Sequence, residues 1–168
     1  EGFDAVISNP PYNDASGNKG QGHKIWDKFV IKSINEWLLK DSYLLTIHPS
    51  GWRQYNNKIL KLLQQKQILY LEIHNVNDGK KMFNCSTRYD WYLLKNIKIY
   101  KKTKIKDEDN TINYIKIDEW KFLPNMLYDK ILELINNDNK IKLLHSESKY
   151  EIRKSHMSKE KTKEFQYP

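Results

Sequence analysis

Three short, mostly apolar runs constrain the fold of this chain more than any other feature. They are FDAVI at residues 3–7, YLLTI at 43–47 and ILYLEI at 68–73, and such runs are typical of strands buried on both faces of a parallel sheet. Between them, apolar residues recur every three or four positions at 26–38 and again at 59–63, which is helical spacing. Strand, helix, strand, helix, strand predicts right-handed βαβ units.

The pattern changes after residue 86. Two strand-like runs in residues 88–105 meet near Lys95 and Asn96, and the polar turn KDEDN then leads into the further run INYIKI. These runs predict antiparallel strands that begin with a hairpin. Helical spacing returns at 126–135. The predicted fold class is therefore α/β, a βαβαβ sheet followed by an antiparallel β-hairpin, with a small carboxyl-terminal α/β extension.

A double proline follows the first predicted strand directly, in SNPPYN at residues 8–13. Prolines fix φ and donate no backbone hydrogen bond, so the strand must end there. Ligands of open α/β sheets bind beyond the carboxyl ends of strands, and HPSGWR at residues 48–53 follows the second strand in the same way. We expect both segments to face one crevice. A simple strand stop would explain the prolines but not Asn9 and Tyr12.

Asn9, Pro10 and Tyr12 suit a planar exocyclic amine such as N6 of adenine. Its lone pair is delocalised, so two acceptors aimed at the N–H bonds would favour electron density on nitrogen, and neutral acceptors avoid an unpaired carboxylate in a dry site. The Asn9 side chain and the Pro10 carbonyl can supply them, with Pro11 fixing the direction of that carbonyl. The Tyr12 ring can stack on the base, which contributes about 1–3 kcal/mol and offsets much of the cost of extruding it.

FDAVISNPPY resembles the catalytic motif of adenine-N6 DNA methyltransferases of the NPPY type, which occur in restriction-modification systems and viruses. GHKIWDKFVIKSINEWL, YLLTIHPSGWR and KMFNCSTRYDWYLLKN add further similarity, so the resemblance covers about residues 1–100. It implies a Rossmann-like sheet that transfers a methyl group from S-adenosylmethionine to a flipped adenine in double-stranded DNA. Asn9 and Pro10 would bind the amine, Tyr12 would stack on the base, and Phe83 would touch its other face, with Tyr89 as the competitor for that place.

Three residues after the second strand are further candidates for substrate binding. His48 lies where it could line the crevice, although a hydrogen bond within the protein is the alternative. Trp52 could line it too, or pack in the core. Arg53 could contact phosphate or a carboxylate of its own chain.

The family's cofactor motif does not occur in these 168 residues. It needs an FxGxG loop that opens a helix after a strand, and an acidic residue at the next strand end. Gly17, Gly20 and Gly22 follow the catalytic turn instead, which favours a loop near the substrate. We therefore expect residues 1–105 to be the carboxyl-terminal half of the catalytic domain and 106–168 a linker and the start of a target-recognition region. The cofactor motif would lie in a missing remainder of the polypeptide, upstream or downstream, and the isolated chain would be inactive.

The charge balance also favours a nucleic-acid partner. Lys and Arg total 29 against 21 Asp and Glu, a net charge of +8, which suits a polyanion. A lysine cluster could line a DNA backbone or only solvate a hairpin; its members are Lys95, Lys98, Lys101, Lys102, Lys104 and Lys106.

The remaining features are weaker. The five histidines are scattered, which predicts no metal site, and the single Cys85 excludes an internal disulfide and is interpreted as structural. Asp138, Glu147 and Lys149 faintly resemble a nuclease motif, for which chance is a sufficient explanation. Without a signal peptide or membrane span, the protein is expected in the cytoplasm, or inside an infected cell if it is viral. The sequence defines no oligomeric state.

Two other functions remain open at this stage. One is an NPPY methyltransferase that acts on an RNA base or a protein glutamine amide. The other is a non-catalytic nucleic-acid-binding remnant.

Overall fold

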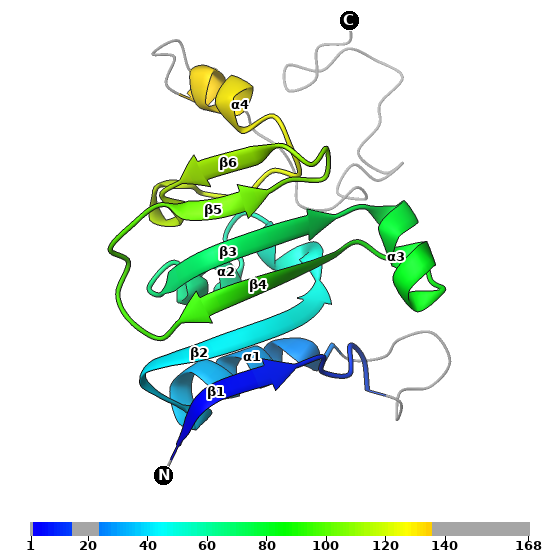
Figure 1. Ribbon diagram of the computed structural model, residues 1–168. Coiled ribbons are helices and arrows are strands. Elements are labelled where there is room, and N and C mark those ends of the chain that lie inside the picture. The colour runs from blue at the N-terminus through cyan, green and yellow to red at the C-terminus, as the bar shows by residue number, and fades with distance from the viewer. Residues whose placement is uncertain (1, 15–23, 136–168) are drawn as a thin grey trace, which may run out of the picture. The chain divides into compact units, whose positions relative to one another are not determined.

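A mixed six-stranded sheet is the framework of the part of the chain that the computed structural model describes, residues 2–14 and 24–135 (Figure 1). The strand order is β1-β2-β4-β3-β5-β6. Their bounds are β1 Phe3–Ser8, β2 Leu38–Pro49, β3 Gln67–His74, β4 Tyr89–Lys95, β5 Thr103–Lys106 and β6 Ile112–Ile115.

Strand direction places several loops at one edge of the sheet. β1 is parallel to β2, with Ser8 opposite Thr46, and β4 is antiparallel to both β2 and β3. β5 is parallel to β3 and antiparallel to β6. Consequently β1, β2, β3 and β5 run in the same direction and end at the same edge, which we call the carboxyl edge (Figure 1).

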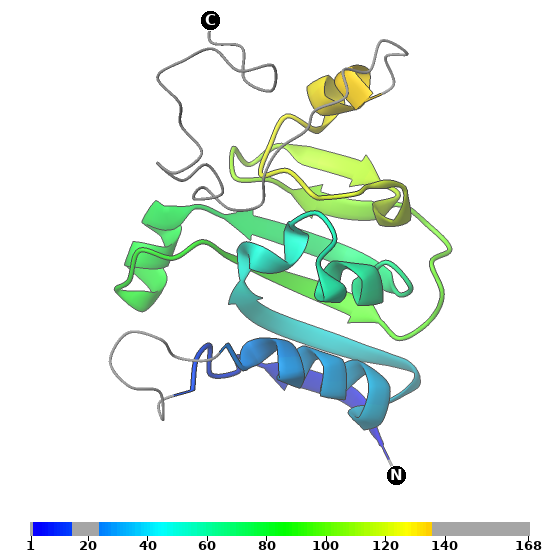
Figure 2. The same ribbon diagram turned by 180° about the vertical axis from the view of Figure 1, so that it is seen from behind.

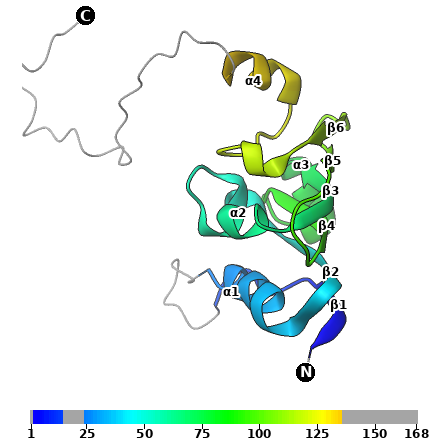
Figure 3. The same ribbon diagram turned by 90° about the vertical axis from the view of Figure 1, so that its left-hand side faces the viewer.

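The connection from β1 to β2 contains α1, and the connection from β2 to β3 contains α2. Both helices pack on the same face of the sheet, as Figures 2 and 3 show. A π-helical turn joins α1 directly to β2, and a 3₁₀ turn links β2 to α2. The bounds are α1 Trp26–Lys32, the π-helical turn Ser33–Trp37, the 3₁₀ turn Ser50–Arg53, α2 Lys58–Leu63, α3 Val76–Phe83, a second 3₁₀ turn Ile117–Glu119 and α4 Tyr128–Ile135.

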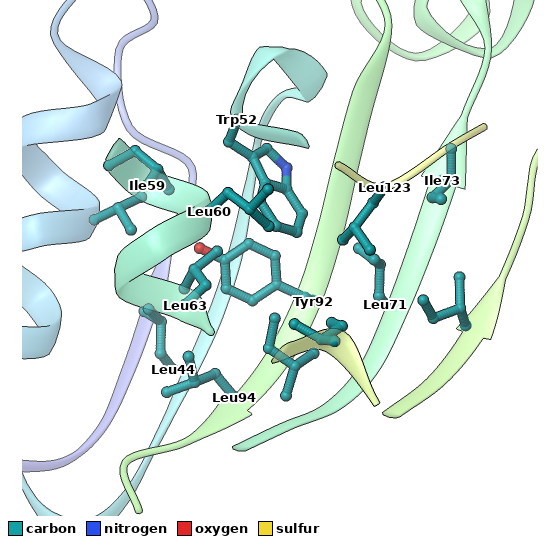
Figure 4. Packing of buried hydrophobic residues seen from close by; sticks show 14 of the residues in the cluster. Leu44, Trp52, Ile59, Leu60, Leu63, Leu71, Ile73, Tyr92, Leu94 and Leu123 are labelled. Carbon is teal, nitrogen blue, oxygen red and sulfur yellow. The ribbon is translucent and has the colours of Figure 1, made fainter. Parts of the chain in front are cut away.

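The core lies between that face of the sheet and the helices. Figure 4 shows Tyr92 of β4 beside Leu60 and Leu63 of α2, with Trp52 next to them. All four are buried. Core side chains alternate along β2, where Leu44 is buried and Tyr43 is exposed.

The opposite face of the sheet is not covered by α1 or α2, so the predicted burial of all three apolar strands on both faces is wrong for β1. Phe3 is 60% exposed and Ile7 80% exposed. A groove of about 420 Å³ runs over this face, between Ile7, Leu45, Ile47 and Trp91. A continuous apolar run indicates that both faces of a strand are apolar, but it does not show whether this part of the chain supplies the helices that would cover the second face.

The predicted hairpin between the two runs in residues 88–105 is also wrong. β4 lies between β2 and β3, and β5 pairs with β3. The connection from β4 to β5 therefore carries the chain across β3 instead of turning back on β4. The later antiparallel pair around the KDEDN turn is confirmed as β5 and β6.

The first predicted helix and second predicted strand meet earlier than expected. α1 ends at Lys32, and β2 begins at Leu38 rather than at residue 43. The expected boundary at residue 105 falls inside β5, and the compact unit runs from Glu1 to Leu132. The assignment of the following residues to a target-recognition region stays a prediction. No helix in the described ranges is long and apolar enough to cross a membrane.

Candidate active site

The NPPY turn begins where β1 ends, at the carboxyl edge. The Ser8 hydroxyl donates to the Thr46 hydroxyl oxygen at 2.8 Å and ties this strand end to β2. Beyond the turn, Ile25 N–H donates to the Tyr12 carbonyl at 3.2 Å, and Asn13 bridges to Lys24. The turn is therefore fastened to the sheet on one side and to the start of α1 on the other.

Within the turn, two acceptors are unengaged. Asn9 is exposed, and in the described part of the chain neither its side-chain amide nor the Pro10 carbonyl makes a hydrogen bond. Pro10 itself is buried, which holds its carbonyl in place. A neutral oxygen pair of this kind can accept two hydrogen bonds from a ligand amine without the desolvation cost of a buried charge.

The same turn contributes Tyr12 to an aromatic pair. The rings of Tyr12 and Phe83 meet edge to face, with centroids 6.1 Å apart and planes at 74°. Phe83 in turn contacts Tyr89 at 5.0 Å. Tyr89 is buried whereas Phe83 is partly exposed, so Phe83 is the ring that can reach a ligand next to Tyr12.

The Tyr12 hydroxyl is buried and has no hydrogen-bond partner among the described residues. Burial raises the pKa of this hydroxyl above its ordinary value, and Cys85 and Tyr89 add to the shift. The phenol is therefore neutral at physiological pH.

Phe83 is brought to Tyr12 by α3, a helix that the sequence analysis missed. Asn75 caps its start by accepting hydrogen bonds from the Asn77 and Asp78 N–H groups, and Asp78 accepts one from the Asn75 N–H in return. Asn84 ends the helix in the left-handed region at φ 53°. This capping box was readable in the sequence as Asn75-x-x-Asp78.

His74, the last residue of β3, also holds α3 against the sheet. The His74 Nε2 lies 3.4 Å from a Glu72 carboxylate oxygen, and its Nδ1 lies 3.4 Å from one of Asp78. The imidazole stacks on Tyr89 at 4.4 Å, with the planes within 10°. The His74 side chain therefore joins β3 and α3 to Tyr89, the ring that contacts Phe83.

Gly79 of α3 is in backbone contact with the chain that follows the helix. A Cβ at this position would lie 1.9 Å from the Thr87 carbonyl oxygen, so we expect Gly79→Ala to lower the free energy of unfolding by about 1–3 kcal/mol. This is the opposite sign from the usual Gly→Ala gain inside a helix. Chemical denaturation measures it. The matched control is exposed Asn77→Ala on the same helix, and equal stability of both variants would contradict the close contact.

His48 is fully buried rather than lining a crevice. Its ring stacks on Trp26 at 4.2 Å. Nδ1 lies 3.1 Å from the Pro49 carbonyl, which only accepts, so Nδ1 carries the proton and Nε2 accepts from the Tyr92 hydroxyl at 3.2 Å. Burial lowers the pKa of His48 to about 4. The residue is a neutral structural bridge between β2 and β4, the alternative weighed above.

Trp52 and Arg53 are also interior residues, joined by a buried carboxylate. One Asp90 oxygen accepts from Trp52 Nε1 and from Arg53 Nε, both at 2.8 Å, while the other has no partner among the described residues. Burial raises the pKa of Asp90, and Arg53 and Trp52 oppose that shift. For Arg53, the observed partner is therefore a carboxylate of its own chain.

The structure thus brings together only part of the predicted site. Asn9, Pro10, Pro11, Tyr12 and Phe83 gather at the carboxyl edge. The other four candidates are buried behind them and support this edge without facing solvent; they are His48, Trp52, Arg53 and Tyr89. A direct substrate contact for those four stays a prediction.

Most of the predicted lysine cluster lies far from the turn. Lys95, the last residue of β4, lies opposite Tyr43 in the middle of β2, about 20 Å along the strand from Pro49. Lys98, Lys101 and Lys102 belong to the following connection at that same distant edge. Lys106 is on β5 and pairs with Glu72 at 3.0 Å. Contact between these lysines and DNA stays a prediction, but not beside the NPPY turn.

The lone cysteine lies near Tyr12 and helps to raise the pKa of its hydroxyl. Cys85 is free and exposed. No group of three or more His, Cys, Asp or Glu side chains that could hold a metal ion occurs within residues 2–14 and 24–135. The weak nuclease pattern at Asp138, Glu147 and Lys149 lies outside the described residues.

The parallel βαβ start and the antiparallel strand inserted between β2 and β3 define a Rossmann-like α/β sheet. A chain from a type I restriction-modification system shares this fold with a TM-score of 0.50 at 13% identity, over 80% of this chain and 29% of that one. The methyltransferase subunit of a type I system from Streptococcus thermophilus aligns with a TM-score of 0.43 at 17% identity, over 80% and 31% of the two chains.

More particularly, residues 1–83 match the model of the Eco57I restriction-modification methylase family. A Mycoplasma pneumoniae protein described as an uncharacterized adenine-specific methylase is 36% identical over 87 residues, which are 48% of this chain and 20% of that protein. These similarities to a restriction-modification methylase family and to an adenine-specific methylase confirm the predicted resemblance. The chain spans about a fifth of the length of this curated relative.

Proposed function

We propose that this chain forms the adenine-binding part of a DNA methyltransferase that modifies the N6 amine of a flipped adenine. The observation that carries the proposal is the pair of unengaged acceptors, Asn9 and the Pro10 carbonyl, in the same turn as Tyr12, whose ring contacts the partly exposed ring of Phe83. Acceptors select an amine, rings select a planar base, and both stand at the carboxyl edge where α/β sheets bind ligands.

Each residue has a distinct task in this proposal. The Asn9 side-chain oxygen and the Pro10 carbonyl each accept a hydrogen bond from one N6–H group. Together they direct the nitrogen lone pair out of the base plane. Tyr12 and Phe83 hold the ring, for which their present edge contact at 6.1 Å must open to admit a base. No nucleophile is required, because positioning brings the amine in line with the methyl donor. As the N–C bond forms, the bond between the methyl group and the sulfonium sulfur of the donor would break to leave a neutral thioether, and the extra amine proton would pass to water.

S-adenosylmethionine is the methyl donor that we propose, as the relationship to methylases implies. The residues of this chain do not by themselves fit it. β1, β2, β3 and β5 end at Ser8, Pro49, His74 and Lys106, and none of these ends is followed by the FxGxG loop expected for the donor. We therefore propose that the donor is held mainly by sequence other than residues 1–168.

The proposal is tested by expressing the complete open reading frame that contains this chain in a bacterial host lacking adenine methylation. Sequencing that detects N6-methyladenine in genomic DNA should reveal one modified sequence context. Methylation found only in RNA or on a protein glutamine amide would replace DNA as the substrate. If neither methylation nor DNA binding is detected, the proposal is wrong and the domain has only a structural role.

Tyr12 separates stacking from hydrogen bonding in this site. Because its hydroxyl has no partner among the described residues, we expect Tyr12→Phe to retain most activity. Tyr12→Ala removes the ring, and losing about 1–3 kcal/mol of stacking lowers methyl transfer roughly ten- to a hundredfold. Methyl-transfer rates and the fluorescence of an adenine analogue at the target position measure both effects. If Phe is as damaging as Ala, the hydroxyl matters and the stacking role is wrong.

A further inference from the structure

A second pocket lies at the carboxyl edge, beyond the end of β2. It has a volume of about 420 Å³ and lies between the 3₁₀ turn Ser50–Arg53 and residues 122–125. Ser50 N–H donates to the Arg88 carbonyl at 3.2 Å, which joins the pocket to the chain entering β4. Since β1 and β2 are parallel neighbours, the pocket and the NPPY turn open from the same edge of the sheet.

The floor of this pocket is rigid because hydrogen bonds from Arg53 hold its two lining segments together. The Arg53 guanidinium donates to the Leu123 and Pro124 carbonyls at 3.0 Å and to the Asn125 side-chain oxygen at 2.9 Å. The Leu123 N–H donates back to the Arg53 carbonyl at 3.0 Å. With Asp90 on its Nε, this buried arginine fixes both walls and has little capacity left for a ligand.

The rim is different, because it presents aromatic rings to solvent. Tyr55 is 69% exposed and Phe122 39% exposed, and neither ring packs against another aromatic ring in the described ranges. The Ser50 hydroxyl, the Gln54 amide and the Tyr55 hydroxyl make no hydrogen bond there either. Rigid walls with free rings and free polar groups at the mouth suit a flat ligand that has polar edges.

A nucleobase has this chemistry. Every base offers a π-face for Tyr55 or Phe122, and its edge can pair with an amide such as Gln54. Arg88, which is paired with Glu108 at the rim, adds N–H donors that can reach the polar edge of a base. We propose that this pocket binds a base of the DNA next to the target adenine, a contact that rests on the proposed function and makes the pocket part of sequence recognition.

The test uses the complete protein and a duplex carrying the methylated sequence found in the genome. Tyr55→Ala and Phe122→Ala should each weaken binding of the labelled duplex about five- to a hundredfold, from the loss of base stacking. Tyr100→Ala is the matched control, because this ring is 62% exposed but follows β4 at the opposite edge. This variant should bind the labelled duplex as tightly as the wild-type protein does.

Abasic substitutions at each position around the target distinguish a base contact from a phosphate contact. At one position the difference between the unmodified protein and Tyr55→Ala should disappear, since the variant can lose nothing more when the base is absent. Unchanged binding by both variants, or a difference that persists at every abasic position, would overturn the inference. Normal methylation alongside such a result leaves the proposed function intact, whereas absent methylation contradicts that function itself.

Discussion

Asn9→Ala in the complete protein should lower the rate of methyl transfer by about 10²–10³-fold, the usual effect of removing one preorganised hydrogen-bonding group from an active site. Affinity for DNA should change little, because it depends mainly on phosphate contacts. Asn9 makes no hydrogen bond within the described residues and is exposed, so its loss should not disturb the fold. Single-turnover rates and filter binding measure the two effects.

The matched control for Asn9 is Asn13→Ala. Asn13 is an exposed asparagine of the same turn whose backbone bridges to Lys24, and its side chain has no role in the proposed site. It should keep nearly full activity. Parallel losses of rate and of DNA binding in the Asn9 variant would indicate a folding role and count against the amine-acceptor mechanism.

Asp90→Ala should be the most destabilising single change, at about 3–5 kcal/mol of unfolding free energy. Asp90 is fully buried and is the partner of both Trp52 and Arg53. Without it, the Arg53 guanidinium stays in the interior with an uncompensated charge. Chemical denaturation followed by tryptophan fluorescence measures the loss.

Two comparisons make the Asp90 experiment specific. Glu119→Ala breaks a solvent-exposed ion pair, Lys116–Glu119 at 3.1 Å, and should cost less than about 1 kcal/mol. The double variant Asp90→Ala/Arg53→Met removes both charges, so it should be less destabilised than the sum of the two single variants. Strict additivity would mean that the two residues do not act as a pair.

The sequence by itself determined the features that depend on local chemistry. Two prolines had to end β1, because they cannot continue its hydrogen bonding, and the apolar runs had to become strands of an α/β sheet. The acceptors and ring of the NPPY turn could therefore be named without coordinates. The capping box at Asn75 and Asp78 was equally local, and α3 could have been predicted from it.

Only the tertiary structure decided which segments meet. Whether β4 pairs with β5 in a hairpin or enters between β2 and β3 depends on non-local hydrogen bonds, which no local pattern encodes. The same holds for burial. His48 and Arg53 lie at and just beyond the carboxyl end of β2, where ligands are expected, yet packing against Trp26 buries His48 and pairing with Asp90 buries Arg53. Phe83 reaches Tyr12 because α3 and the sheet bring together residues that are far apart in the chain.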